Sequence, residues 1–254
     1  MIFEKYIPGY PKNAAYNALA EMMNGVDIGA SYADMIRYRI SGAAADDCKD
    51  IYYVAHEHDN AIARLWNGWG QHSDAIGNWG NFYTDAAYRG KGIGGKVLKF
   101  WYEDFRQMSD PPLCFLCSAA TKELTDLYRR FGFRPALENT EFGPLYLPVG
   151  DSPETFREFY QNYYTPSDVL YHKKANVGYR HEIDCLLRFV YRDLGLTFGI
   201  DHLRKIEEGI LRFPERCGML FSQDGHCVGW SFDKKIQVHP MYRSSSLVDV
   251  DVFN

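Results

Sequence analysis

The chain has 254 residues, of which 46% are hydrophobic and 24% charged, with a formal net charge of −5. This composition is typical of a folded globular protein and excludes a chain that is disordered throughout. The length allows one large domain or two modest ones. No apolar run approaches the ~20 residues that a membrane helix needs, and the first residues carry no signal-peptide pattern. We therefore expect a cytoplasmic protein with no membrane partner.

The charge is spread evenly along the chain, with one exception. Residues 1–150 carry 15 Lys/Arg against 18 Asp/Glu, and residues 151–254 carry 13 against 15. Neither part is basic, so we expect no nucleic-acid partner. Residues 89–134 hold nine Lys/Arg against five Asp/Glu. A basic segment in an acidic protein indicates an anionic ligand.

The six cysteines are scattered and, without a secretory signal, are expected to be reduced thiols. Cys114 and Cys117 form a C-x-x-C pattern inside an apolar run, 113–118, that predicts a buried strand. Positions three apart on a strand point to opposite faces, so we expect these thiols to share neither a metal nor a disulfide. We interpret them as core residues and expect no metal site.

In the first 150 residues, periodicity predicts strands that alternate with helices. Ser31 and Thr121 are the expected N-caps of the second and last helices, and Gly132 is the expected left-handed residue after the last one. The predicted helices cover 13–24, 31–40, a segment after 88–95 that runs to 108, and 121–131. The predicted strands cover 51–55, 61–66, 78–84, 113–118 and 145–149. This order predicts an α/β (α+β) fold, a mixed twisted sheet flanked by helices.

Gly150-Asp-Ser-Pro153 is the strongest boundary pattern, because Ser152 is a good N-cap and Pro153 a good first helical residue. It predicts one domain over 1–150 and a smaller α+β domain over 151–254. Asp224-Gly225 predicts the turn of a β-hairpin. The second domain is expected to contain helices at 153–164, 179–194 and 201–213, hairpin strands at 219–222 and 227–232, and an edge strand at 247–253.

Residues 90–96, Gly-Lys-Gly-Ile-Gly-Gly-Lys, resemble two phosphate-binding patterns. Gly90, Gly92 and Gly95 satisfy the dinucleotide fingerprint G-x-G-x-x-G, whereas Val97 stands where a P-loop needs Ser or Thr. In both patterns glycines let the backbone approach a phosphate, and N–H groups at a helix start point at the anion. A dinucleotide fold places this loop after its first strand. Two helices and about three strands precede it here, so NAD binding is the weaker interpretation.

Two motifs together resemble the GNAT acetyltransferases. Tyr88-Arg-Gly-Lys-Gly-Ile-Gly94 is similar to the family's acyl-CoA loop, Gln/Arg-x-x-Gly-x-Gly/Ala, through Arg89, Gly92 and Gly94. About forty residues later, Leu127-Tyr-Arg-Arg-Phe-Gly-Phe133 resembles the family's second motif, a helix that ends in Leu-Tyr-x-x-x-Gly-Phe. The order of the predicted elements resembles the family as well. The resemblance covers about residues 1–150 and implies the GNAT fold, acetyl-CoA as co-substrate and N-acetyltransferase activity.

The resemblance also implies roles for individual residues. The loop amides would hold the CoA pyrophosphate, and the strand before the loop would bind the pantetheine arm and polarise the thioester carbonyl. Tyr128 matches the tyrosine that protonates the leaving thiolate, although periodicity alone would place it in the core. Thr121 stands where the family often has an asparagine that contacts CoA. The implied cofactor-binding residues are Thr84, Ala86, Arg89, Gly90, Lys91, Gly92, Ile93, Gly94, Gly95 and Thr121, with Lys96 as additional charge.

One family feature is missing, because residues 79–84 contain no glutamate to act as general base. A base with a pKa near 7 would help the acceptor amine lose its proton. The candidates in this sequence are Asp85, Glu57, His56, His58, His72 and Asp74. Three tryptophans before the loop, Trp66, Trp69 and Trp79, either pack in the core or line an acceptor pocket.

The last hundred residues echo the first domain. Helices and a hairpin are followed by Val238-His-Pro-Met-Tyr-Arg-Ser244, where Tyr242 and Arg243 parallel Tyr88 and Arg89. This order predicts either a truncated second half-domain without CoA binding, which would shape an acceptor site or a homodimer contact, or an unrelated α+β extension.

We therefore expect an acetyl-CoA-dependent N-acetyltransferase in which a primary amine attacks the thioester directly. The acceptor would be a small-molecule or peptide amine. The main alternative is a non-catalytic acyl-CoA-binding sensor or pseudoenzyme, which the missing glutamate favours.

Overall fold

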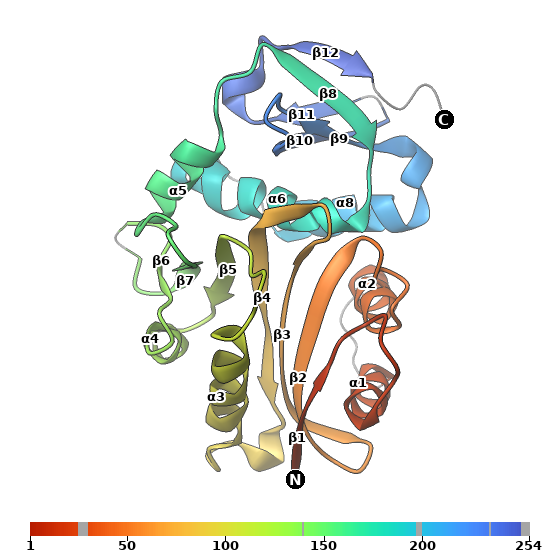
Figure 1. Cartoon of the computed structure of the whole chain (residues 1–254), viewed down its shortest axis with the longest axis vertical. Helices are drawn as coiled ribbons and strands as arrows, with labels where there is room; N and C mark the ends of the chain where they lie inside the picture. Colours follow the sequence, from red (N-terminus) through yellow and green to blue (C-terminus); the bar gives the residue numbers. More distant parts are fainter. Residues whose placement is uncertain (25–29, 139, 197–199, 234, 250–254) are drawn as a thin grey trace. The chain divides into compact units, whose positions relative to one another are not determined.

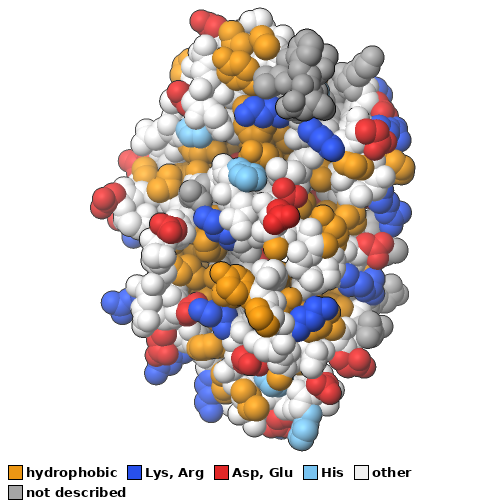
Figure 2. All heavy atoms as spheres, turned by 45° about the vertical axis from the view of Figure 1, so that its right-hand side comes forward, with side chains coloured by type: hydrophobic (Ala, Val, Ile, Leu, Met, Phe, Trp, Pro, Cys, Tyr) orange, Lys and Arg blue, Asp and Glu red, His pale blue; other side chains and the backbone are white. Residues whose placement is uncertain are grey.

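The structure is a computed structural model of the chain, and it describes residues 1–24, 30–138, 140–196, 200–233 and 235–249. The chain divides by compactness into two units, Met1–Pro112 and Leu113–Asn254. This division lies at residue 112, and the domain boundary near residue 150 stays a prediction. No helix within the described ranges is long and apolar enough to cross a membrane. Basic and acidic side chains are interspersed on the face drawn in Figure 2.

The first unit is a four-stranded antiparallel meander with helices on both faces (Figure 1). Each strand pairs with the next one along the chain, in the order β1-β2-β3-β4. The strands are β1 (Ile2–Tyr6), β2 (Cys48–Glu57), β3 (Asn60–Gly70) and β4 (Ser73–Thr84). The helices are α1 (Ala14–Asn24), α2 (Ala30–Ile40), the 3-10 turn η1 (Ala86–Tyr88) and α3 (Ile93–Phe105).

The two faces of this sheet have different partners. Tyr52, Val54 and Trp66 face α1 and α2, where they join the buried core. On the other face, Tyr53 donates its hydroxyl proton to Asp104 of α3 at 2.7 Å. Asp104 also pairs with Lys5 of β1, so α3 is held to the sheet by an acidic residue as well as by apolar packing.

The second unit contains the remaining strands. Three of them pair antiparallel in the order β5-β7-β6, and five more form the order β11-β10-β9-β8-β12. The strands are β5 (Cys114–Ala119), β6 (Arg134–Pro135), β7 (Gly143–Pro148), β8 (Val169–Lys174), β9 (Cys217–Phe221), β10 (Cys227–Phe232), β11 (Lys235–Val238) and β12 (Ser246–Asp249). The helical segments are α4 (Lys122–Arg129), α5 (Phe156–Tyr163), η2 (Val177–Tyr179), α6 (Arg180–Asp184), η3 (Cys185–Val190), α7 (Tyr191–Asp193), α8 (Ile200–Arg212), η4 (Pro214–Arg216) and η5 (Pro240–Tyr242).

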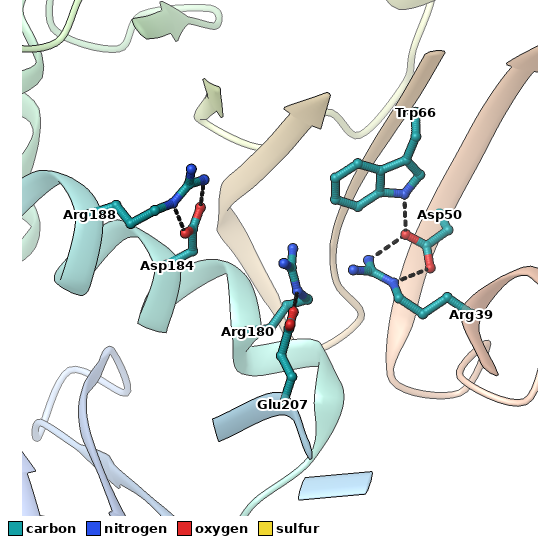
Figure 3. A network of polar contacts seen from close by, with 7 residues as sticks. All are labelled: Arg39, Asp50, Trp66, Arg180, Asp184, Arg188 and Glu207. Atoms are coloured by element: carbon teal, nitrogen blue, oxygen red, sulfur yellow. Dashed lines mark hydrogen bonds and ion pairs between the residues drawn. The ribbon is translucent and has the colours of Figure 1, made fainter. Parts of the chain in front are cut away.

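The segment from α6 to α7 is buried although it is rich in charged residues. Arg180 pairs with Glu207 of α8, and Arg188 pairs with Asp184 one turn before it (Figure 3). Breaking such a pair from one side leaves an uncompensated buried charge, so these contacts fix how the helices pack. The middle of the segment, η3, is a π-helix between two α-helical ends, so the predicted helix over 179–194 is confirmed as one continuous helical run with wider hydrogen-bond spacing at its centre.

The strands of the second unit repeat the order of the first. Between β8 and β9 lie two helical stretches, as between β1 and β2, and the strands pair antiparallel in the order β8-β9-β10-β11. A 3-10 turn follows each fourth strand. The copies then differ, because α3 follows η1 whereas β12 follows η5 and pairs parallel to β8. This shared strand order defines a first and a second copy of one half-sheet, β1–β4 and β8–β11, whereas the truncated half-domain stays a prediction.

The two copies also agree in backbone detail. The β2–β3 register shifts at Ile62, whose carbonyl accepts a hydrogen bond from the N–H of Asp85 at 2.8 Å. The β9–β10 register shifts at Val228, whose carbonyl accepts from the N–H of His239 at 2.9 Å. The same irregularity therefore holds the start of the 3-10 turn in both copies.

Several predicted element ends were wrong. The helix predicted over 153–164 begins at Phe156, because Thr155 is its N-cap and Ser152 instead donates to the Leu113 carbonyl. The Thr155 hydroxyl accepts from the N–H of Glu158 and donates to the Glu158 carboxylate. The strands β1, β6, β8 and β11 were missed. The partners of β1 and β8 lie far along the chain, and β6 and β11 are only two and four residues long. The predicted N-cap Ser31 was wrong, because α2 already begins at Ala30. Residues 250–253 of the predicted last strand lie outside the described residues.

The prediction for Cys114 and Cys117 is confirmed. Both lie in β5, both are buried, and both are free thiols. Burial raises the pKa of the Cys117 thiol, with Arg188 opposing the shift, so the thiol stays protonated.

Candidate active site

The glycine-rich loop joins β4 to α3 through η1. Gly90 and Gly92 have φ angles of 76° and 75°, in the left-handed region that glycine adopts without strain. Gly92 is the N-cap of α3, a helix of 13 residues. The first N–H groups of a helix have no acceptor within it, so those of Ile93, Gly94 and Gly95 are available to an anion.

Gly94 is required for a different reason, which is close approach. A Cβ at this position would lie 2.8 Å from Thr84 Oγ1 and 3.0 Å from the Phe82 ring. A Cβ on Gly95 would meet nothing within 4 Å. The first turn of α3 therefore packs directly on the end of β4, which fixes the direction in which its N–H groups point.

Basic side chains surround this loop. The Arg89 Nε donates to the Thr84 carbonyl at 3.0 Å, and its guanidinium lies 5.8 Å from the Tyr83 ring centre. Lys91 lies 5.0 Å from the Tyr88 ring centre. Arg89, Lys91 and Lys96 are all exposed, so their charge faces solvent around the helix start.

This loop fits the diphosphate of coenzyme A. Its glycines leave open space where side chains would otherwise project, its amides stand at a helix N-terminus, and three cations surround it. The predicted coenzyme-binding residues from Thr84 to Gly95 all lie in the first unit. Within the described part of the chain, no cluster of His, Cys, Asp or Glu could hold a metal ion.

The sequence did not predict the irregularity in β4. Asn81 has a φ of 49°, and the pairing with β3 passes from Arg64–Tyr83 to Trp66–Gly80, so β4 contains one extra residue. Asparagine is one of the few residues that tolerate this conformation. Bulges are frequent beside active sites, and Gly80-Asn81 was the available signal.

Tyr128 lies on α4, which Thr121 caps by accepting from the N–H of Leu124 at 3.3 Å. The predicted cap is confirmed, whereas a CoA contact by Thr121 stays a prediction. Tyr128 is 5% exposed, and burial raises its pKa, with a smaller contribution from Cys117. The phenol therefore keeps its proton at neutral pH, as a proton donor must. Gly132 has a φ of 93° after this helix, as predicted.

The candidate bases lie at the ends of the first sheet or are already engaged. Asp85 caps η1 by accepting from the N–H of Ala87, and Glu57 lies 3.4 Å from the Met1 amino group. His56 is buried, with Nδ1 bonded to the His58 carbonyl. His72 lies in the exposed turn between β3 and β4, and the side chain of Asp74 lies outside the described residues.

The three predicted tryptophans are buried. Trp66 donates its Nε1–H to Asp50 at 2.7 Å, and the Arg39 guanidinium lies 4.7 Å from its ring centre (Figure 3). Trp69 is 4% exposed, and Trp79 packs edge-on against Trp101 of α3. These contacts favour the core interpretation.

Sequence analysis missed the buried polar group around Asp50. Its carboxylate accepts from Arg39 Nε at 2.9 Å, and both side chains are at most 5% exposed. A Cβ on Gly68 would overlap this carboxylate. The contact ties the end of α2 to β2 and β3 and so fixes one wall of the first unit.

Comparison with known proteins agrees with the two sequence motifs. Residues 48–135 match a family model described as an acetyltransferase (GNAT) domain. The match begins at the first residue of β2 and ends at the last residue of β6. A search of curated proteins found no match.

Solved structures show weak likeness. ElaA of Escherichia coli is 16% identical, with a TM-score of 0.41 over 57% of this chain and 97% of its own. An acyl-CoA N-acyltransferase from Pseudomonas aeruginosa is 15% identical, with a TM-score of 0.42 over 59% of this chain and 99% of its own. An acetyltransferase from Streptococcus agalactiae is 14% identical, with a TM-score of 0.40 over 58% of this chain and 98% of its own. Since all three scores are below 0.5, these likenesses carry no argument about chemistry. The family match over residues 48–135 shows that the chain carries a GNAT domain.

Proposed function

We propose that the protein transfers an acetyl group from acetyl-CoA to a primary amine. The observation that carries the proposal is the loop between β4 and α3, which presents helix-start amides to an anion through the glycines that the GNAT motif requires. The same residues, Arg89 to Gly95, would hold the CoA pyrophosphate. The backbone of β4 near Thr84 and Ala86 would bind the pantetheine arm.

In the proposed reaction, the neutral amine attacks the thioester carbonyl carbon and forms a tetrahedral intermediate. An N–H of β4 would stabilise the oxyanion in this step. The C–S bond then breaks, and Tyr128 would give its proton to the leaving thiolate. The phenol is protonated at neutral pH, as a proton donor must be, although burial raises its pKa and so makes it a weaker acid. The ammonium proton of the tetrahedral intermediate passes to solvent or to a base among the six candidates, and the Tyr128 phenolate regains a proton from solvent.

The test is thiol release from acetyl-CoA by the purified full chain. The acceptor panel would contain a polyamine, an aminoglycoside, amino acids and a peptide with a free N-terminus, with product acetylation checked by mass spectrometry. Amine-dependent thiol release with a matching acetylated product is the expected result. CoA binding without turnover on any amine would instead indicate the acyl-CoA sensor. If the chain neither binds CoA nor releases thiol with any amine, the proposal is wrong.

We also propose the cytoplasm as the location, a small-molecule or peptide amine as the acceptor, and a homodimer as the assembly. These proposals rest on the sequence and the family resemblance. Size-exclusion chromatography with light scattering tests the assembly, and a monomer at working concentration would refute it.

A further inference from the structure

The second copy of the half-sheet has an open face where the first copy carries α3. In the first copy, Tyr53 of β2 and Lys5 of β1 both reach Asp104 of α3. Strand pairing places Gly218 and Lys174 at the equivalent positions of β9 and β8. No helix follows η5 among the described residues, since the chain continues into β12. On this face, Ile236 and Leu247 are 45% and 44% exposed.

The floor of the open face is polar, whereas a sheet face that packs against a helix is mainly apolar. The imidazole of His172 on β8 crosses β9 above Gly218, and its Nε2 lies 2.7 Å from Ser231 Oγ on β10. A Cβ on Gly218 would overlap this imidazole, so only glycine allows the contact. A histidine and a serine side by side can donate to and accept from a small polar ligand.

A pocket of about 600 Å³ lies above this floor, within the usual size range of ligand sites. Arg216 stands in its wall, held between the Phe213 and Phe232 rings, with its guanidinium 5.2 and 4.6 Å from their centres. Asp233 accepts two of its five N–H groups, through Nε and one Nη. The other Nη has no hydrogen-bond partner among the described residues and can bind an anion, in an orientation that the two rings fix.

The same pocket also offers an acidic and an apolar surface. Glu215 lines it, is exposed, and makes no ion pair with the described residues. Ile236 and Leu247 form apolar parts of its wall. The pocket therefore combines a cation, an anion and an aliphatic surface over a hydrogen-bonding floor. A ligand that matches all of these carries a carboxylate, an ammonium group and an aliphatic side chain.

We propose that this pocket binds an aliphatic zwitterion, as found in a free amino acid such as leucine or in a short peptide such as leucyl-leucine. The carboxylate binds Arg216, the ammonium group binds Glu215, and the aliphatic side chain lies against Ile236 and Leu247. This site belongs to the second copy, which lacks the glycine-rich loop, so it does not depend on the proposed acetyl transfer.

The test is titration calorimetry of the full chain without acetyl-CoA, with leucine and leucyl-leucine as separate probes. Two half-ligands serve as controls, 4-methylpentanoate without the ammonium group and 3-methylbutylamine without the carboxylate. We expect at least one zwitterion to bind at least about tenfold more tightly than either half-ligand, since hydrogen bonds to charged groups are worth this much. No saturation by either zwitterion up to about 10 mM, or equal binding of a half-ligand, would overturn the proposal.

Variants locate the site. Arg216→Gln should weaken binding of the zwitterion at least about tenfold. Arg212→Gln is the matched control. Arg212 is as exposed as Arg216 and also pairs with a carboxylate, that of Glu208, but it lies outside the pocket. The Arg212→Gln variant should therefore bind the zwitterion as tightly as the unaltered chain. Glu215→Gln should weaken the binding of leucine but not that of 4-methylpentanoate. If Arg216→Gln fails to fold, this comparison alone tests the site. Unchanged leucine affinity in Glu215→Gln would refute the site.

Discussion

Asp85 and His239 occupy the same backbone position in the two copies of the half-sheet, directly before the 3-10 turn. Each residue precedes the 3-10 turn, with φ and ψ of −53° and 139° for Asp85 and −52° and 136° for His239. The Asp85 carboxylate accepts from the N–H of Ala87 at 2.9 Å, and His239 Nδ1 accepts from the N–H of Met241 at 3.2 Å. The two copies thus use different side chains for one structural purpose, which is to cap the 3-10 turn.

His239 should make stability depend on pH in the acid range. Burial lowers its pKa from 6.5 to about 4. Between these two values the unfolded chain binds a proton that the folded chain does not, so stability falls as pH falls from about 6.5 to 4. The contribution is at most about 3 kcal/mol, from a shift of roughly two and a half pKa units.

The measurement is urea unfolding at several pH values between 4 and 7. In His239→Asn, asparagine can still cap the turn but cannot take up the proton, so the acid dependence should become weaker. His58→Asn is the control, since His58 is exposed and its φ of 54° suits asparagine. An identical pH profile in His239→Asn and the unaltered chain would contradict this assignment.

Alanine at Gly94 should disturb the loop, whereas alanine at Gly95 should not. A Cβ on Gly94 would meet Thr84 and Phe82 and push the first turn of α3 away from β4. We expect CoA affinity in Gly94→Ala to fall at least about tenfold, because several amides would shift together. Gly95→Ala keeps its N–H, meets nothing and favours the helix, so affinity should be retained. Equal CoA affinities in calorimetry would show that the start of α3 does not hold the coenzyme.

Tyr128→Phe should separate turnover from binding. Removal of the phenolic proton should lower kcat by about 10²-fold or more, while CoA affinity changes little, because the group acts only as the thiolate leaves. Tyr242→Phe is the control, a buried tyrosine whose hydroxyl donates to the Thr165 carbonyl. Thiol-release kinetics with a reactive amine provide the measurement. A kcat in Tyr128→Phe equal to that of the control would remove Tyr128 as the proton donor.

Asp50→Ala should strongly destabilise the first unit. The substitution leaves the buried Arg39 guanidinium without its counter-charge and the Trp66 N–H without its acceptor. The expected loss is about 3–5 kcal/mol in the free energy of unfolding. Asp34→Ala, which breaks the exposed pair with Arg37, should cost under about 1 kcal/mol. Similar urea midpoints for the two variants would show that the buried pair contributes little.

Local patterns in the sequence were enough for the helix-start loop and the α4 motif. Gly90 and Gly92 need left-handed backbone, Thr121 caps a helix and Gly132 follows one, and each requirement depends on near neighbours. The C-x-x-C strand was also predictable, since a short apolar run between turns is a local signal. The resemblance of Tyr242-Arg243 to Tyr88-Arg89 is also a local pattern, and the second half-domain that it predicted stays a prediction.

Long-range partners decided the rest. Asp50 and Arg39 are eleven residues apart, yet only the packing of α2 on β2 makes them a buried pair. The strands β1 and β8 exist because of distant pairing partners, and the bulge at Asn81 because of its register with β3. The pocket beside Arg216 joins residues from η4, β8, β10, β11 and β12. The sequence alone determined the left-handed turns at Gly90, Gly92 and Gly132 and the capped start of α4, because those preferences are local. Tertiary structure alone decided which charges become buried and which face stays open, because burial depends on residues far along the chain.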